Sequence, residues 1–195
     1  RLRATGRTEL LGACLRTGLV PVLMFSALLA AALWLAAPAI TRHLPSQTEE
    51  MISQYAPALR VLAVFLPLLA LTDALLTATR GYRAMRPTVL FDRVLRSALQ
   101  LVLVGAAGMA ILWHQPLWTV ALPLITLAWA LPYLPVTVLS AYALRKLYLG
   151  NRPPGGTVDR TARRTLRRDF WRFTGPRAVA SVAQLALQRV DVLLV

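Results

Sequence analysis

Long apolar stretches alternate with short polar segments along the whole chain. Four of them predict membrane-spanning helices, because their lengths are close to the roughly 20 residues that a helix needs to cross a hydrocarbon core. They are approximately Thr17–Ile40, Ala56–Thr79, Ser97–Trp113 and Leu117–Leu144. The pattern therefore predicts an all-α fold, a polytopic transmembrane helical bundle.

A fifth apolar stretch, Phe173–Val195, carries polar side chains at spacings of three or four residues, which places them on one helical face. A charge at the bilayer centre costs about 2.5–3.5 kcal/mol, so we expect this face to line a bundle interior or a water-filled cavity. Alternatively, Arg189 and Asp191 satisfy neighbouring helices and Arg177 snorkels to the interface. The polar stripe comprises Thr174, Arg177, Ser181, Gln184, Gln188 and Asp191, with Arg189 at its edge.

The second apolar stretch contains one carboxylate near its end. Asp73 shares a helical face with Thr77 and Arg80, at spacings of four and seven residues. Two interpretations stay open: Asp73 lines a polar pathway, or an arginine such as Arg80 neutralises it in a structural pair.

Small residues and prolines shape the third and fourth stretches. Gly105, Gly108 and the adjacent alanines are small enough to allow a close helix–helix approach. Pro123, Pro132 and Pro135 each remove a backbone donor and predict kinks in the fourth helix.

Composition argues against a soluble domain. The 195-residue chain is 57% hydrophobic and carries a net charge of +14, with its charges gathered between the apolar stretches. Basic residues beside membrane segments favour contact with anionic lipids over nucleic acid. The single Cys14 and the distant His43 and His114 predict neither a metal site nor another cofactor. No nucleophile has a base beside it, so we do not expect an enzyme.

The charges of the connectors predict an orientation. Residues 1–16, 80–96 and 145–172 are rich in arginine, whereas the connector Thr41–Tyr55 is acidic and the turn at His114 is neutral. By the positive-inside rule the three basic segments are cytoplasmic, and we expect a multi-pass protein of the bacterial cytoplasmic membrane.

Three stretches resemble a known family. They are LPLLALTDALLTATRGYRAMRPTV (Leu66–Val89), FDRVLRSALQLVLV (Phe91–Val104) and FWRFTGPRAVASVAQLALQRVDVLLV (Phe170–Val195). They are similar to the multidrug/oligosaccharidyl-lipid/polysaccharide flippase superfamily, especially its bacterial polysaccharide-export (oligosaccharide flippase) branch. The resemblance lies in diffuse patterns over most of the chain.

The resemblance implies a two-lobe, V-shaped fold of which this chain is an internal fragment, completed by the remainder of its own chain. Residues 1–149 would hold helices three to six of the first lobe, and 150–172 would form a basic cytoplasmic linker. Residues 173–195 would begin the second lobe as a truncated helix seven. The chain starts at Arg1 and ends at Val195 inside an apolar stretch, which agrees with this expectation.

The implied function is to flip a lipid-linked oligosaccharide or polysaccharide precursor by alternating access. Arginines suit a pyrophosphate-linked, anionic substrate because the guanidinium donates in a fork. The stripe residues Arg177, Ser181, Gln184, Gln188, Arg189 and Asp191 would line the cavity, with Asp73 contributing from the first lobe.

Three alternatives remain at this stage. An ion-coupled multidrug or cation antiporter of the same superfamily would use Asp73 or Asp191 as its ion carrier. A membrane-embedded transferase acting on lipid carriers would need a catalytic cluster, to which only His43 with Glu49 and Glu50 comes near. A non-transporting scaffold of the cell envelope is the third.

Overall fold

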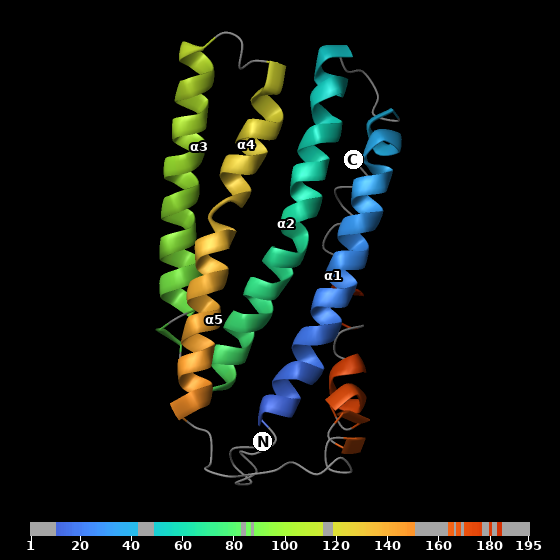
Figure 1. The fold of residues 1–195 in the computed structure, drawn as a ribbon, viewed down its shortest axis with the longest axis vertical. Helices are drawn as coiled ribbons and strands as arrows, with labels where there is room; N and C mark the ends of the chain where they lie inside the picture. The colour runs from blue at the N-terminus through green and yellow to red at the C-terminus, as the bar shows by residue number, and fades with distance from the viewer. Residues whose placement is uncertain are drawn as a thin grey trace. The chain divides into compact units, whose positions relative to one another are not determined.

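A computed structural model describes most of the chain (Figure 1). The described residues are 11–42, 49–82, 85–86, 88–114, 119–150, 164–165, 167–168, 170–176, 180 and 183–184. The chain divides into two compact units, one formed by Gly18–Gly150 and the other by Arg1–Thr17 with Asn151–Val195. The unit Gly18–Gly150 holds the long helices.

Every regular element among the described residues is a helix, which confirms the all-α prediction. The elements are α1 (Leu11–Arg42), α2 (Glu49–Gly81), the π-helix η2 (Thr88–Leu95), α3 (Arg96–Trp113), α4 (Ala121–Ala130) and α5 (Tyr133–Gly150). They form four stretches that are long and apolar enough to cross a membrane: Gly12–Arg42, Ser53–Gly81, Thr88–Trp113 and Ala121–Gly150. The chain is therefore a membrane-embedded protein.

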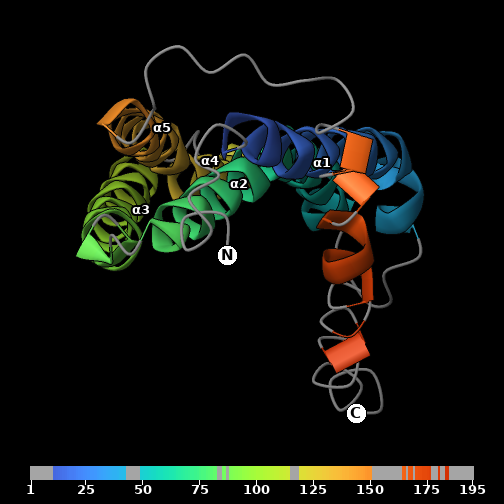
Figure 2. The same cartoon turned by 90° about the horizontal axis from the view of Figure 1, so that it is seen from below.

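Helix α2 is at the centre of the packing. It contacts α4 and α5, while α3 packs against α4 and η2 contacts α5. Successive membrane-length stretches run in opposite directions (Figure 1), and the view along the helices shows the start of α3 beside α5 (Figure 2). Leu76 of α2 and Val136 of α5 are among the largest fully buried side chains.

The outer faces of the helices are apolar. Phe25, Leu35 and Leu101 expose 77%, 78% and 78% of their surfaces. In water such faces would drive association, whereas in a bilayer they meet acyl chains as apolar as themselves. Association between the helices then depends on close packing and polar contacts, and several of the buried residues are accordingly alanines or threonines.

The third membrane-length stretch begins earlier than the sequence predicted. The helix predicted from Ser97 is preceded without a break by η2, so the stretch starts at Thr88. The charges of Asp92, Arg93 and Arg96 had suggested a polar connector there. Asp92 and Arg96 pair with each other one turn apart, which neutralises two of the three charges and lets the helix continue.

Only one of the three prolines divides the fourth stretch. Helix α4 ends at Ala130 and α5 begins at Tyr133, with Pro132 between them. Pro123 and Pro135 lie in the first turns of α4 and α5, where the backbone donor has no partner within the helix and its loss costs little. The kink is therefore set by position rather than by the number of prolines.

The small residues of α3 differ in their surroundings: Ala107, one of the alanines beside the two glycines, is buried, whereas Gly105 and Gly108 have open space beside them. A β-carbon added at either glycine would meet no atom within 4 Å. The buried residues of α3 are Ala107 and Ile111, four positions apart on a different face. Small size alone did not reveal which face of the helix makes the contact.

Candidate functional site

Hydroxyl side chains form a buried seam between α2 and α5. Thr72 and Thr79 of α2, with Thr137 and Ser140 of α5, are at most 7% exposed. Spacings of seven and three residues place each pair on one face of its helix. The hydroxyls of Thr72 and Thr137 hydrogen-bond to each other across the contact. We call these four residues the hydroxyl seam.

The seam also bonds to its own helices. Thr72 Oγ1 donates to the Leu68 carbonyl at 2.8 Å, and Thr79 Oγ1 donates to the Leu76 carbonyl at 2.7 Å. Such back-bonding is the usual way for hydroxyls to be satisfied inside a helix. Ser140 Oγ is buried and has no hydrogen-bond partner among the described residues, so it is available to a polar group that enters the seam.

An ion pair lies at the contact of η2 and α3 with α5. Arg96 Nη1 is 2.6 Å from Asp92 Oδ1, and the two side chains are 29% and 23% exposed. The guanidinium carbon of Arg96 lies 5.3 Å from the centroid of the Tyr133 ring on α5, within the range of a cation–π contact. Arg96 is therefore held by a carboxylate on one side and an aromatic ring of the facing helix on another.

The break at Pro132 positions Tyr133. Helix α5 starts at Tyr133, whose ring is 5.9 Å from that of Trp129, the two ring planes being inclined at 58°. Just before the break, the Trp129 carbonyl accepts a hydrogen bond of 3.1 Å from Nε2 of Gln100 on α3. Prolines free backbone carbonyls that a neighbouring helix has to satisfy in a membrane. Helix α3 is thus hydrogen-bonded to the end of α4 through Gln100, four residues after Arg96 of the ion pair.

Asp73 is the predicted cavity residue that belongs to the unit Gly18–Gly150. Its side chain on α2 is exposed. The ion pair found among the described residues is Arg96–Asp92, so the structure does not show the structural pairing of Asp73 with Arg80.

The other predicted cavity residues belong to the unit that includes Asn151–Val195. Within that unit, residues 170–176 are helical, and Gln184 is helical with an exposed side chain. Because Asp73 and Gln184 fall in different units, their sharing of one cavity stays a prediction. Outside the described residues lie Arg177, Ser181, Gln188, Arg189 and Asp191.

Sequence reasoning missed Arg60, the Asp92–Arg96 pair and the role of Tyr133. Arg60 had a clear signal, because it is the only charged residue between Tyr55 and Asp73. An ionisable side chain inside an apolar stretch marks a functional candidate by default. Asp92 and Arg96 were assigned to a connector, and nothing in the sequence pattern indicated that Tyr133 faces them.

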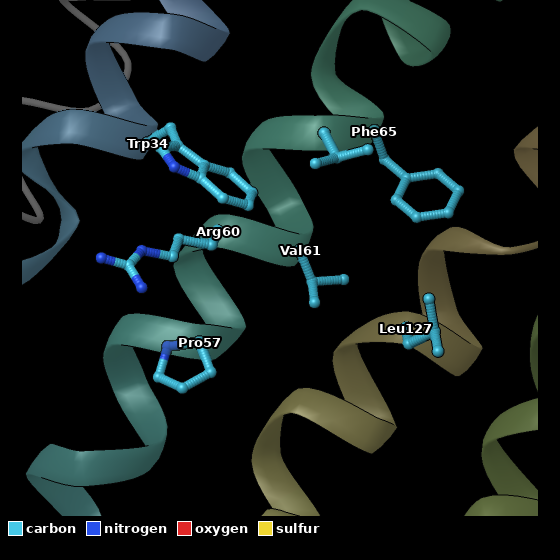
Figure 3. Close-up of a pocket in the computed structure, with 7 residues that line it drawn as sticks. Trp34, Pro57, Arg60, Val61, Phe65 and Leu127 are labelled. Atoms are coloured by element: carbon cyan, nitrogen blue, oxygen red, sulfur yellow. The ribbon is translucent and has the colours of Figure 1, made fainter.

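Arg60 lines an open groove of about 410 Å³ formed by α1, α2 and α4. Its guanidinium carbon lies 5.6 Å from the centroid of the Trp34 ring on α1. Figure 3 shows Arg60 directed away from Leu127 of α4 and Trp34 at the α1 side of the groove. The other lining residues are Pro57, Val61, Val64, Phe65 and Leu127.

The start of α4 is held beside this groove by α2. Gln54 Oε1 accepts a hydrogen bond of 3.1 Å from the Leu122 backbone N–H, one of the donors left free at a helix start. The side chain thus replaces a capping residue that α4 lacks, since its N-cap Val120 offers no side-chain oxygen.

No family model, curated protein or solved structure matches the chain. Within the described residues no group of three or more His, Cys, Asp or Glu could hold a metal ion. What the arrangement offers chemically is hydrogen bonding in the buried hydroxyl seam and charge on membrane-length helices, at Arg60, at the partly exposed Asp92–Arg96 pair and at the exposed Asp73.

Proposed function

We propose that the chain is part of a transporter that flips a lipid-linked oligosaccharide or polysaccharide precursor across the bacterial cytoplasmic membrane by alternating access. The observation that carries the proposal is the presence of polar and charged side chains on membrane-length helices, some of them buried between helices. The hydroxyl seam, Asp73 and the Asp92–Arg96 pair all lie on such helices. Polar groups are costly in hydrocarbon and typically mark a substrate or ion pathway.

The resemblance of Leu66–Val89, Phe91–Val104 and Phe170–Val195 to the flippase superfamily supplies the substrate class. In the proposed transporter the polar stripe, which includes Arg177, Gln184 and Arg189, contributes polar groups to substrate binding, and Asp73 contributes from the first lobe. The arginines of the stripe bind the pyrophosphate of the lipid carrier through forked hydrogen bonds. The hydroxyl seam provides donors and acceptors that are suited to sugar hydroxyls.

We infer the orientation from the basic end of the bundle. The end of α2, the start of η2 and the end of α5 lie at one end of the unit Gly18–Gly150 (Figure 1). In the proposed orientation this end faces the cytoplasm, where positive residues of membrane proteins gather. It carries five exposed basic residues: Arg80, Arg86, Arg93, Arg145 and Lys146.

One observation favours a second function, that of an ion-coupled antiporter. The Asp73 carboxylate lies exposed on a membrane-length helix and forms no ion pair with the described residues. A carboxylate without a permanent counter-charge can take up and release a proton or a sodium ion. In that function Asp73 carries the coupling ion, and the transported molecule is a cation.

The test compares export in cells that lack the full-length gene and carry either the wild-type protein or a variant. We expect the deletion to leave lipid-linked precursor on the inner leaflet and the wild type to restore surface saccharide. Asp73→Asn should reduce export about tenfold, which corresponds to about 1.4 kcal/mol in the limiting step. Arg189→Ala and Asp191→Ala should also reduce export without preventing membrane insertion.

The matched control is Asp159→Asn, which removes a carboxylate from the predicted 150–172 linker and should leave export unchanged. Normal saccharide export in the deletion strain would contradict the flippase proposal. If that strain also became more sensitive to cationic drugs, the antiporter would be the better explanation.

A further inference from the structure

The groove between α1, α2 and α4 contains a cation, Arg60, for which no anionic partner is found among the described residues. Arg60 contacts the Trp34 ring, but its Nε is buried and has no hydrogen-bond partner among the described residues. The ion pair found among those residues does not include Arg60. The remaining lining is apolar, from Pro57 to Phe65 on α2 and at Leu127 on α4. A guanidinium at the edge of an apolar groove matches a ligand that combines an anionic group with an apolar chain.

The position of Arg60 along α2 places its side chain near the phosphate level of a bilayer, which indicates a lipid as the source of the anion. The stretch Ser53–Gly81 has 29 residues, about 43 Å at 1.5 Å per residue, against a hydrocarbon core of about 30 Å. Arg60 lies seven positions from Ser53, a few Å inside the edge of that core. From there an arginine side chain reaches the phosphate level by snorkelling. Tryptophans such as Trp34 are enriched at the same level.

We propose that this groove binds one anionic glycerophospholipid from the leaflet at the Ser53 end of the bundle. The lipid phosphate accepts hydrogen bonds from Arg60, while the Trp34 ring holds the guanidinium in place. One acyl chain lies along Val61, Val64, Phe65 and Leu127. The groove, of about 410 Å³, is open along one side, so a lipid can enter it from the bilayer. This proposal does not depend on the proposed transport function.

A photoactivatable phosphatidylglycerol, with its reactive group on the acyl chain, tests the site. The full-length protein is reconstituted in phosphatidylcholine vesicles with a small fraction of this probe, irradiated and mapped by peptide mass spectrometry. We expect labelling to concentrate on Val61–Phe65 and Leu127. Arg60→Gln should reduce it about fivefold, the effect of one arginine near a membrane surface.

Two further variants distinguish lipid binding in the groove from general electrostatic attraction of the anionic lipid to basic residues. Arg42→Gln removes an exposed arginine from the same end of α1 and should leave the labelling of α2 and α4 unchanged. Val64→Trp keeps Arg60 but fills the groove, and should abolish labelling of Leu127. Circular dichroism confirms that each variant keeps its helices.

Four results would overturn the proposal, the first three of them in single comparisons. These three are unchanged labelling in Arg60→Gln, equal labelling by a phosphatidylcholine probe of the same chain, and labelling spread evenly over exposed residues such as Leu101 of α3. A loss of labelling in Arg60→Gln but not in Val64→Trp would show simple charge attraction and would equally reject an acyl chain in the groove.

Discussion

At the scale of single residues, Arg96 shows how the bundle accommodates a charge. Its guanidinium meets the Asp92 carboxylate and the Tyr133 ring, so that neither charge faces the apolar interior alone. Breaking a fully buried pair costs about 3–5 kcal/mol, whereas a surface pair contributes about 0–1 kcal/mol. Since both side chains are partly exposed, an intermediate value is expected.

We predict that Asp92→Asn lowers the free energy of unfolding by about 1–2 kcal/mol, because Arg96 loses its counter-charge. The double variant Asp92→Leu with Arg96→Met should recover most of this loss. Unfolding in mixed detergent micelles measures the three values. Arg93→Gln, an exposed neighbour on η2, is the control and should have little effect. A double variant that is no more stable than Asp92→Asn would contradict the prediction that the uncompensated charge of Arg96 causes the loss.

The charged residues of the site could be predicted from the sequence, whereas their contacts with other helices could not. Asp73 was found because a carboxylate stands out in an apolar stretch, and Arg60 could have been found by the same rule. The Tyr133–Arg96 contact could not be found this way. It joins residues 37 positions apart and depends on how α5 is turned against α3, which no local pattern encodes.

At the scale of elements, the junction of α4 and α5 is the clearest irregularity. Pro132 lacks a backbone N–H, so the Ala128 carbonyl loses its helical donor, and Gln100 of α3 supplies a bond to the adjacent Trp129 carbonyl. The junction is therefore a place where the regular helix is interrupted and a neighbouring helix satisfies the Trp129 carbonyl.

We predict that Pro132→Ala slows amide hydrogen exchange over residues 131–136 by about tenfold. The alanine restores a helical hydrogen bond to Ala128, and about 1.4 kcal/mol changes a local opening equilibrium by that factor. Pro123→Ala is the matched control. It lies in the first turn of α4, where a proline removes no helical hydrogen bond, so exchange should stay unchanged. Equal slowing in both variants would contradict the explanation.

Elements were predicted best where apolar runs are long. The helices α1 and α2 extend a few residues beyond the stretches predicted as Thr17–Ile40 and Ala56–Thr79, because polar residues at helix ends do not stop a helix. The sequence pattern does not predict the start of the third stretch at Thr88, because the charges of Asp92, Arg93 and Arg96 indicate a polar connector. An i, i+4 ion pair between Asp92 and Arg96 removes that signal.

At the scale of the whole molecule, charge separates one end of the unit Gly18–Gly150 from the other. We predict that the triple variant Arg80→Glu, Arg86→Glu and Arg93→Glu gives mixed orientations in the membrane or loses expression, because positive residues near span ends set topology. Labelling of a single cysteine placed at Thr119, with Cys14 replaced by serine, reports the side of the membrane. The result expected is labelling from both sides.

The control for this variant removes charge of the opposite sign at the other end of α2. Glu49→Gln with Glu50→Gln should leave the orientation unchanged, since acidic residues contribute little to topology. An unchanged orientation of the arginine variant would argue against the proposed cytoplasmic face. The number and order of the membrane-length helices could be predicted from the sequence, whereas the faces they turn to one another depend on side-chain fit along the whole bundle.

The contact between Thr72 and Thr137 has a consequence for how the bundle responds to charge. The two hydroxyls own two hydrogens, yet they make three hydrogen-bond contacts: Thr72 with the Leu68 carbonyl, Thr137 with the Tyr133 carbonyl, and the two hydroxyls with each other. One hydroxyl must therefore turn from its carbonyl to its partner, and either of them can do so. The seam therefore has two hydrogen-bond arrangements with the same heavy-atom positions, in which the hydroxyl–hydroxyl bond dipole points in opposite directions. Rotation about two C–O bonds interconverts them, so the α2–α5 contact can follow a charge passing beside it without moving either helix.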